Sequence, residues 1–343
     1  MKSTPRNEIM TYLEDTFMEG WIDKHLLPID TMWQPADYLP DARDPDFINR
    51  VRHIQNVARD IPYDVLAVLI GDMITEEALP TYQSELLTLD GIDPRNEKGW
   101  AQWSRRWSGE ENGHGDTLHT ALYLTGRVDM RSVQRDTQQL IGAGIKNNSA
   151  GDPLETLFYV CAQERATHTS HSNVGKLLKK AGNTELYDIC SRIGKDETRH
   201  ATAYEKMVQE VINIIPSEMV VLFSNMMKKD GIIMPAALLT ESGKPQGELF
   251  NHFSHAAQRT EVYTAQDYLD IYIRLITKLK ITDLVDLTPE AQEAQEYLCG
   301  RLPKVIQMKI KRDDPSKFVD DYKFSWISEP ESTKTYSIPN EIR

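Results

Sequence analysis

Cysteine is scarce in this chain of 343 residues, which contains only Cys161, Cys190 and Cys299, far apart and in no C-x-x-C pair. This spacing argues against a disulfide framework, a zinc ribbon and a thiolate iron site. Long apolar runs are missing too, because no stretch of about 18 uninterrupted apolar residues occurs, and this excludes a membrane-spanning helix. We expect a reducing compartment in which the cysteines fill the core.

Positive charge is in deficit, with 39 Lys and Arg against 52 Asp and Glu and a net charge of −13. Such a surface repels a phosphate backbone, so we expect no nucleic-acid partner, although a local basic patch for an acidic partner remains compatible. The first segment, MKSTPRNEIMTYLEDTF, has no apolar stretch and carries early acidic residues. It therefore predicts neither a signal nor a transit peptide.

Alternating β-branched runs bounded by turn residues are almost absent, so we expect little sheet. Apolar residues recur instead at three- and four-residue steps, which predicts helices. Long helices are expected over 62–90, 98–125, 153–181 and 183–214, and shorter ones over 6–24, 45–59, 130–143, 216–228, 246–258, 264–279 and 289–312. Pro80 is expected to kink the first long helix, and 144–152 to form a loop.

The length allows one large domain or two ordinary ones, and a composition of 40% apolar and 27% charged residues is typical of globular proteins. No change in composition divides the chain. We therefore expect a single all-α domain over 1–343, with a polar, irregular tail over about 313–343 that wraps the surface. Long helices of this kind usually pack side by side as a bundle.

The motif Glu-x-x-His occurs twice, from Glu111 to His114 and from Glu197 to His200. Residues three apart on a helix project from one face, so each pair can offer a carboxylate and an imidazole to one metal ion. A lone pair of this kind arises readily by chance and then marks a solvated helix face. The surroundings of both pairs decide between these interpretations.

Each pair follows another predicted long helix that carries a glutamate in an apolar stretch. Glu76 precedes Glu111 by 35 residues, and Glu164 precedes Glu197 by 33. In two antiparallel helices joined by a turn, such a separation places the glutamate of the first helix and the Glu-x-x-His pair of the second at the same level along the bundle axis. Two facing hairpins then supply four carboxylates and two imidazoles, as in di-iron four-helix bundles. We expect a ferritin-like di-iron bundle over about 62–214, extended by additional helices, in which two divalent irons neutralise the buried carboxylates.

Other candidate ligands are weaker. His171 lies two turns after Glu164, and we expect it to contact a ligand rather than bind metal. Asp72 is expected to be solvated or hydrogen-bonded. His168 with His171 and His252 with His255 form H-x-x-H pairs, but the histidine-rich boxes of membrane-bound desaturases accompany membrane-spanning helices, and none is present here. We expect His252 and His255 at surface or core-edge positions.

Several longer segments resemble the soluble plant-type acyl-acyl-carrier-protein desaturases. They are GDMITEEALPTYQ (71–83), EENGHGD (110–116), LYLTGRVDM (122–130), QERAT (163–167) and DETRHATAY (196–204), with WQPADYLPD (33–41), AQRTEVYTAQDY (257–268) and FSWI (324–327) extending the likeness to nearly the whole chain. The resemblance implies a homodimeric helical bundle with two irons per subunit. It also implies that dioxygen and two electrons from ferredoxin are used to insert a cis double bond into a saturated C16 or C18 acyl chain on acyl carrier protein, with Δ9 as the expected position.

The resemblance further implies roles for individual residues. Glu76, Glu111, His114, Glu164, Glu197 and His200 match the iron ligands, with Glu111 and Glu164 resembling the bridging pair. Thr167 matches a hydroxyl that manages protons, and Trp33 and Asp196 match an electron path to His114. Near the acyl channel lie Thr88, Leu89, Thr156 and Leu157, and candidates for docking the carrier protein are Arg199, Tyr204, Lys228 and Lys229.

Some positions depart from the family pattern. Gly113 stands where Arg is usual, Thr156 and Leu157 replace Gly-Phe, and Glu85 replaces an apolar residue near the channel. Segment 226–235 is one residue longer. These departures leave the acyl chain length and the double-bond position open. Without a transit peptide, the sequence favours a bacterial cytoplasmic enzyme over a mature plastid form.

Three other functions were weighed. A ferritin-like protein that oxidises iron uses the same ligands without an acyl channel. The radical subunit of ribonucleotide reductase commonly has Asp as first ligand and a Tyr after the first histidine, where this chain has Glu76 and Leu118. A metal-free helical interaction protein would leave four carboxylates without counter-charge in apolar surroundings. The desaturase is therefore the main hypothesis, and the iron-oxidising protein is the alternative.

Overall fold

The structure is a computed structural model, and it describes residues 5–145, 147, 149, 151–229, 231–241, 244, 248–312, 318–319 and 321–328. Within these residues helices account for the regular structure, and extended pairing is limited to one antiparallel bridge between Val128 and Ile327. This confirms the expected all-α fold. None of the described helices is long and apolar enough to cross a membrane.

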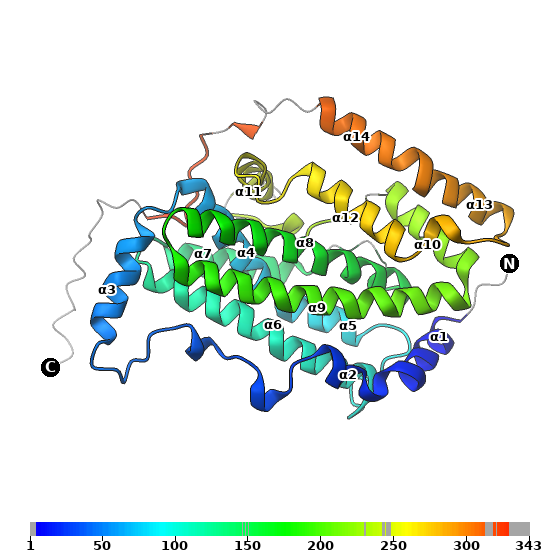
Figure 1. The fold of residues 1–343 in the computed structure, drawn as a ribbon, viewed down its shortest axis with the longest axis horizontal. Coiled ribbons are helices and arrows are strands. Elements are labelled where there is room, and N and C mark those ends of the chain that lie inside the picture. Colours follow the sequence, from blue (N-terminus) through cyan, green and yellow to red (C-terminus); the bar gives the residue numbers. More distant parts are fainter. Residues whose placement is uncertain are drawn as a thin grey trace.

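Four long helices form the bundle: α4 (Tyr63–Glu77), α6 (Gly99–Leu124), α8 (Pro153–Lys180) and α9 (Thr184–Ile214). Figure 1 shows them side by side at the centre of the molecule. Local sequence sets their starts, because Asp152 accepts a hydrogen bond from the Leu154 amide and Asn183 accepts one from the Leu186 amide. Gly182, at φ 84°, makes the tight turn that joins α8 to α9.

The expected kinked helix over 62–90 is two helices. Helix α4 ends at Glu77, Ala78 leaves helical geometry at ψ 6°, and α5 runs over Leu79–Leu87. The break precedes Pro80, which occupies the first turn of α5, where its missing amide costs no hydrogen bond. The prediction of one helix was therefore wrong, and Glu76 lies at the C-terminal end of α4 rather than inside a longer helix.

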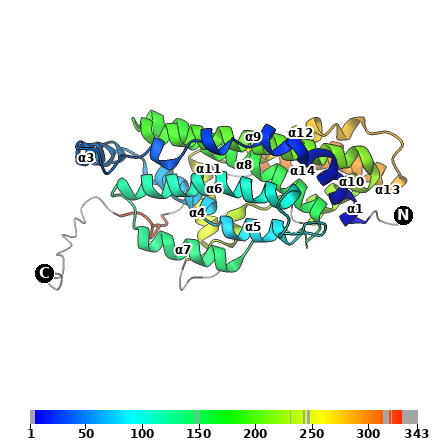
Figure 2. The same ribbon diagram turned by 90° about the horizontal axis from the view of Figure 1, so that it is seen from below.

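Shorter helices surround the bundle. They are α1 (Arg6–Leu13), α2 (Glu19–His25), α3 (Phe47–Ala58), α7 (Met130–Ala143), α10 (Pro216–Lys229), α11 (Glu248–Arg259), α12 (Ala265–Lys278), α13 (Pro289–Glu296) and α14 (Leu302–Arg312). Figures 1 and 2 place α3 at one end of the molecule and α10, α13 and α14 toward the other. Gly71 allows Phe253 of α11 to press against α4, since a Cβ there would lie 2.1 Å from its ring.

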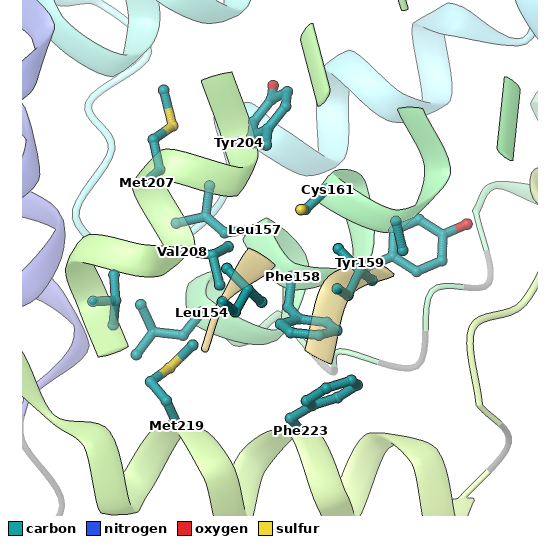
Figure 3. Packing of buried hydrophobic residues seen from close by; sticks show 14 of the residues in the cluster. Leu154, Leu157, Phe158, Tyr159, Cys161, Tyr204, Met207, Val208, Met219 and Phe223 are labelled. Carbon is teal, nitrogen blue, oxygen red and sulfur yellow. The ribbon is translucent and has the colours of Figure 1, made fainter. Parts of the chain in front are cut away.

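Buried apolar side chains form the core between these helices. Figure 3 shows one part of it, where Leu157 of α8 lies on the side that faces Val208 of α9. The ring of Phe158 packs against that of Phe223 of α10, tilted by 40°, with 3.9 Å between ring centroids. Burying a side chain of this size contributes roughly 1.5–3 kcal/mol. This packing fixes how α8 and α9 are rotated, and so which of their faces meet at the centre of the bundle.

The C-terminal segment is anchored more firmly than expected. Trp326 is fully buried, and its Nε1 donates to Asp136 Oδ2 of α7 at 2.9 Å. The expectation that the tail only wraps the surface is therefore wrong for residues 324–326, because Phe324 is buried as well. The rest of the expected tail, residues 313–317, 320 and 329–343, lies outside the described residues.

Candidate metal centre

The six predicted ligands meet in the middle of the bundle, and none of them is more than 7% exposed. Their ligand atoms form two groups within which all atoms lie within 4.8 Å of one another. One group is Glu76, Glu111, His114 and Glu197, and the other is Glu111, Glu164, Glu197 and His200. Two adjacent four-residue groups of carboxylates and imidazoles suit two iron or manganese ions.

The two residues common to both groups are Glu111 and Glu197. The expected bridging pair was Glu111 and Glu164; in the structure Glu197, rather than Glu164, joins Glu111 in both groups. Glu197 Oε1 lies 3.1 Å from His114 Nδ1, so this carboxylate reaches the first group as well as the second. Of the two ligand histidines, Glu164 lies beside His200, at 3.5 Å from Nδ1.

The inner atoms of this cluster fit a pair of cations. Four buried polar atoms there have no hydrogen-bond partner: Glu111 Oε1, Glu197 Oε1, His114 Nδ1 and His200 Nδ1. They nevertheless face one another closely, for example at 2.8 Å between His200 Nδ1 and Glu111 Oε1. Buried groups of this kind require a partner, and cations among them would supply one to every lone pair.

The electrostatics of the cluster also reflect crowded carboxylates. Burial and the charge of Glu197 raise the pKa of Glu164 well above its usual range. Burial alone would raise the pKa of Glu76 too, but the neighbouring imidazoles of His114 and His171 lower it to about 2. Carboxylates so close together repel one another unless positive charge is added, which is what divalent metal ions provide.

Each ligand histidine has a second carboxylate on its outer side. Asp196 Oδ2 lies 3.5 Å from His114 Nε2 and accepts a hydrogen bond of 2.6 Å from Trp33 Nε1. The Trp33 ring also stacks on His114, with centroids 5.9 Å apart. The structure thus brings together the three residues that the resemblance assigns to an electron path. An outer carboxylate of this kind orients the imidazole and raises its basicity.

Glu110 does the same for His200 and was missed by the sequence analysis. Its Oε2 lies 2.9 Å from His200 Nε2, and its Oε1 accepts from the Leu27 amide at 2.5 Å. The signal was present in the sequence, because an acidic residue immediately precedes both Glu-x-x-His motifs, as Glu110 and Asp196. The pairing is crossed: the acid beside each motif contacts the histidine of the other.

Arg199 joins these two outer carboxylates. Its Nη1 donates to Asp196 Oδ1 at 2.6 Å, its Nη2 donates to Glu110 Oε2, and its Nε donates to the His25 carbonyl at 2.9 Å. The side chain is 22% exposed, and these contacts engage all three of its nitrogens. These contacts are internal to the metal centre, and the docking of a carrier protein by Arg199 stays a prediction.

Further side chains hold the carboxylates in place. Thr167 Oγ1 donates to Glu197 Oε2 at 2.5 Å, and Trp107 Nε1 donates to Glu164 Oε1 at 3.1 Å. His171 Nε2 lies 2.8 Å from Glu76 Oε1, which confirms that it contacts a ligand. Asp72 is buried and accepts from Ser170 Oγ at 2.9 Å, and burial raises its pKa to about 6. The hydrogen-bonded alternative for Asp72 is thus the correct one.

One cavity lies at this cluster, and a second cavity adjoins the first. The first, of about 640 Å³, extends from Glu76, Glu111, Glu164 and Glu197 along α5 and α8 past Tyr159 to Ile145 and Thr156. The second, of about 890 Å³, lies under α11 and α12 and is walled by Phe250, Phe253, Tyr263 and Tyr268. Thr75, Thr167 and Pro235 line both cavities, which are therefore neighbours, and of the two it is the first that the four ligand carboxylates line.

The four residues expected at the acyl channel are placed differently from one another. Thr156 lines the first cavity, and so does Glu85. Leu157 is directed to the other side of α8, toward Tyr204 and Val208, as Figure 3 shows. Among the described residues that line the two cavities, Thr88 and Leu89 do not occur; Thr88 is exposed and Leu89 belongs to the core.

The other docking candidates also separate. Tyr204 is 1% exposed, and its hydroxyl accepts a hydrogen bond from Trp103 Nε1 at 2.9 Å. The prediction that Tyr204 contacts a docked partner is therefore wrong, because the ring is enclosed by the core. Lys228 and Lys229 are exposed at the end of α10, and their role stays a prediction.

Comparison with known proteins agrees with this geometry. A family model described as fatty acid desaturase matches residues 5–328. The chain is 44% identical over 319 residues to a chloroplastic stearoyl-[acyl-carrier-protein] 9-desaturase of Spinacia oleracea, covering 90% of this chain and 79% of that protein. Identity is 43% over 324 residues to a protein of the same name from Gossypium hirsutum, covering 92% and 80%. With nearly its whole length matched and its metal-binding side chains assembled, this chain belongs to the fatty acid desaturase family.

Proposed function

We propose that this chain is an acyl-[acyl-carrier-protein] desaturase that inserts a cis double bond into a saturated C16 or C18 chain, with Δ9 as the expected position. Dioxygen is the oxidant and ferredoxin the source of two electrons. The names of the relatives, which are stearoyl-[acyl-carrier-protein] 9-desaturases, support the substrate class. The chloroplastic location belongs to those relatives and is not carried over to this chain. For this chain we propose a location in the bacterial cytoplasm and a homodimeric assembly.

The observation that carries the proposal is the first cavity, which is lined by the four ligand carboxylates and adjoins the second cavity. An acyl chain that enters through the second cavity and ends in the first would lie with its middle beside the carboxylates. Confinement in a narrow apolar space selects which carbons face the reactive centre and excludes water. A protein that only oxidises iron needs no such space, and this distinguishes the two hypotheses.

Two irons, held by Glu76, Glu111, His114, Glu164, Glu197 and His200, would supply the oxidising chemistry that breaks an unactivated C–H bond. The residues of the chain bind the irons and orient the acyl chain. Thr167 lies on the cavity side of the site and donates its hydroxyl proton to Glu197, so it is placed to hold a proton there. Trp33, Asp196 and His114 form a continuous contact path from the N-terminal segment to the centre.

Turnover tests the proposal. Iron-loaded protein with ferredoxin, its reductase and NADPH is incubated with palmitoyl- and stearoyl-carrier protein, and the released fatty acids are analysed by mass spectrometry. A monounsaturated product supports the proposal and locates the double bond. Two bound irons and continued oxygen consumption without product would favour the iron-oxidising alternative. Glu111→Ala serves as the matched inactive control.

A further inference from the structure

The outer face of α14 carries an exposed stripe. Its members are spaced by three and four residues, so they lie along one side of the helix. They are Arg301, Lys304, Val305, Met308, Lys309 and Arg312, all exposed, with Val305 at 42% and Met308 at 52%. We call these six residues the α14 surface. Two apolar side chains sit at its centre, and cations stand at both ends.

The charge of this region is opposite to that of the chain. From Tyr297 to Arg312 the sequence YLCGRLPKVIQMKIKR contains five Lys and Arg and no Asp or Glu, although the net charge of the chain is −13. Within the described part of the chain, none of these five cations forms an ion pair or hydrogen bond. A solvated face would explain cations alone, but it would not explain exposed Val305 and Met308 between them.

The cationic region continues onto α10. Lys228 is exposed, and its Nζ lies 4.9 Å from the centre of the Tyr297 ring, in the turn just before α14. Lys228, a docking candidate by resemblance, thus lies beside the helical turn that leads into α14. An apolar centre surrounded by charge is the usual composition of a protein–protein interface.

The position of α14 relates it to the second cavity. Helix α14 packs on α12, and Ala265 and Tyr268 in the first turn of α12 line that cavity. In Figure 1 the C-terminal end of α14 lies toward the start of α12. A partner seated on the α14 surface would therefore be separated from the cavity by α14 and α12.

We propose that the α14 surface docks an acidic protein, and that this partner is the carrier that delivers the acyl chain. The inference rests on the proposed function. The positive charge of the surface favours an acidic partner. The position of the second cavity nearby favours a partner that delivers the substrate. The electron donor fits less well, because Trp33 belongs to the segment between α2 and α3, which runs along the opposite edge of the molecule from α14 in Figure 1.

Reversal of two charges tests the docking surface. In the full-length, iron-loaded protein, Lys309→Glu with Arg312→Glu should raise KM for stearoyl-carrier protein by about tenfold, leave kcat unchanged and leave KM for ferredoxin unchanged. The matched control reverses Arg50 and Arg52, which are exposed on α3 at the far end of the molecule and change the net charge equally. The control should keep the wild-type KM.

Two further measurements separate charge from fold and docking from catalysis. Val305→Ser with Met308→Ser should weaken binding of stearoyl-carrier protein, measured by fluorescence anisotropy, and leave its salt dependence unchanged, whereas Lys309→Glu with Arg312→Glu should flatten that dependence. The anisotropy assay measures binding without turnover. If the wild-type protein bound the carrier through α14 but formed no product, the proposed function would be contradicted and the docking surface would not.

Three results would overturn the dock. The first is an unchanged KM and affinity for the carrier in both double variants. The second is a raised KM for ferredoxin alone. The third is that the protein sediments with phosphatidylglycerol vesicles, that the α14 substitutions abolish this sedimentation, and that they leave the affinity for the carrier unchanged. This result would identify the α14 surface as a membrane contact.

Discussion

The carboxylate of Glu110 and the imidazole of His200 lie 2.9 Å apart, on the side of the ring that faces away from the inner carboxylates. Asp196 stands in the same relation to His114 at 3.5 Å. The two Glu-x-x-His helices thus support each other, since each provides the outer carboxylate for the other's histidine. Metal affinity at one position should therefore depend on the opposite helix.

Removing these outer charges should weaken the two metal positions separately. Glu110→Gln should lower the affinity of the position that contains His200, and Asp196→Asn that of the position that contains His114, each by about 10- to 100-fold, because the imidazole loses basicity and orientation. Anaerobic titration with Fe²⁺ measures both steps. Asp136→Asn, which removes a buried carboxylate next to Trp326, is the control and should leave the isotherm unchanged. Equal loss at both positions in each variant would contradict the crossed pairing.

Arg199 should act on both positions at once. Arg199→Gln removes the guanidinium that bridges Asp196 and Glu110, so both binding steps should weaken. Arg192 contacts only the Asp196 side, at 3.1 Å, so Arg192→Gln should affect mainly the position of His114. If Arg199→Gln alters only the KM for carrier protein and neither Fe²⁺ affinity, Arg199 is a docking residue after all.

The length of the first cavity should set the acyl preference. Thr156 lies eight residues before Glu164 on α8, which places it about 12 Å along the helix axis. Thr156→Phe should fill that end and lower kcat/KM for stearoyl- relative to palmitoyl-carrier protein by about tenfold or more. Thr88→Phe, at an exposed position outside both cavities, is the comparison. An altered preference in Thr88→Phe alone would restore the expectation drawn from the resemblance.

His25 should make stability depend on pH. Burial and the charges of Lys206, Lys24 and Arg199 lower the pKa of this imidazole to about 4. In the unfolded chain the His25 imidazole is protonated near pH 6.5, whereas in the folded chain it is protonated only near pH 4. The free energy of unfolding therefore decreases as the pH falls from about 6.5 to about 4. His25→Phe keeps a ring beside Trp21 and should reduce the loss between pH 7 and 4.5 by about 1–2 kcal/mol.

Urea unfolding of wild type and His25→Phe at both pH values measures this difference. The two free energies of unfolding should diverge as the pH is lowered, with the variant retaining more stability. Parallel pH profiles would show that His25 does not contribute.

The ligands could be predicted from the sequence because helical spacing alone fixes their common height. Glu76 and Glu111, and Glu164 and Glu197, are separated by one hairpin each, and the repetition makes chance a poor explanation. The sharing of Glu197 rather than Glu164 could not be predicted, since it depends on how α8 and α9 rotate about their axes. That rotation is set by distant core contacts such as Phe158 on Phe223.

The remaining errors have similar causes. Tyr204 was expected at the surface, but α9 is covered there by α6, and Trp103 bonds its hydroxyl. The break at Ala78 follows from backbone geometry next to Pro80, where helix propensity alone predicts only a kink. Glu110 was overlooked because its partner, His200, lies 90 residues away on another helix.

The number of irons bound per chain tests the account most directly. Anaerobic Fe²⁺ titration of wild type should give two, and Glu111→Ala should lose both, because Glu111 belongs to both ligand groups. Its helicity, followed by circular dichroism, should stay that of the wild type. One iron or none in the wild type, or two irons in Glu111→Ala, would contradict a shared di-iron centre.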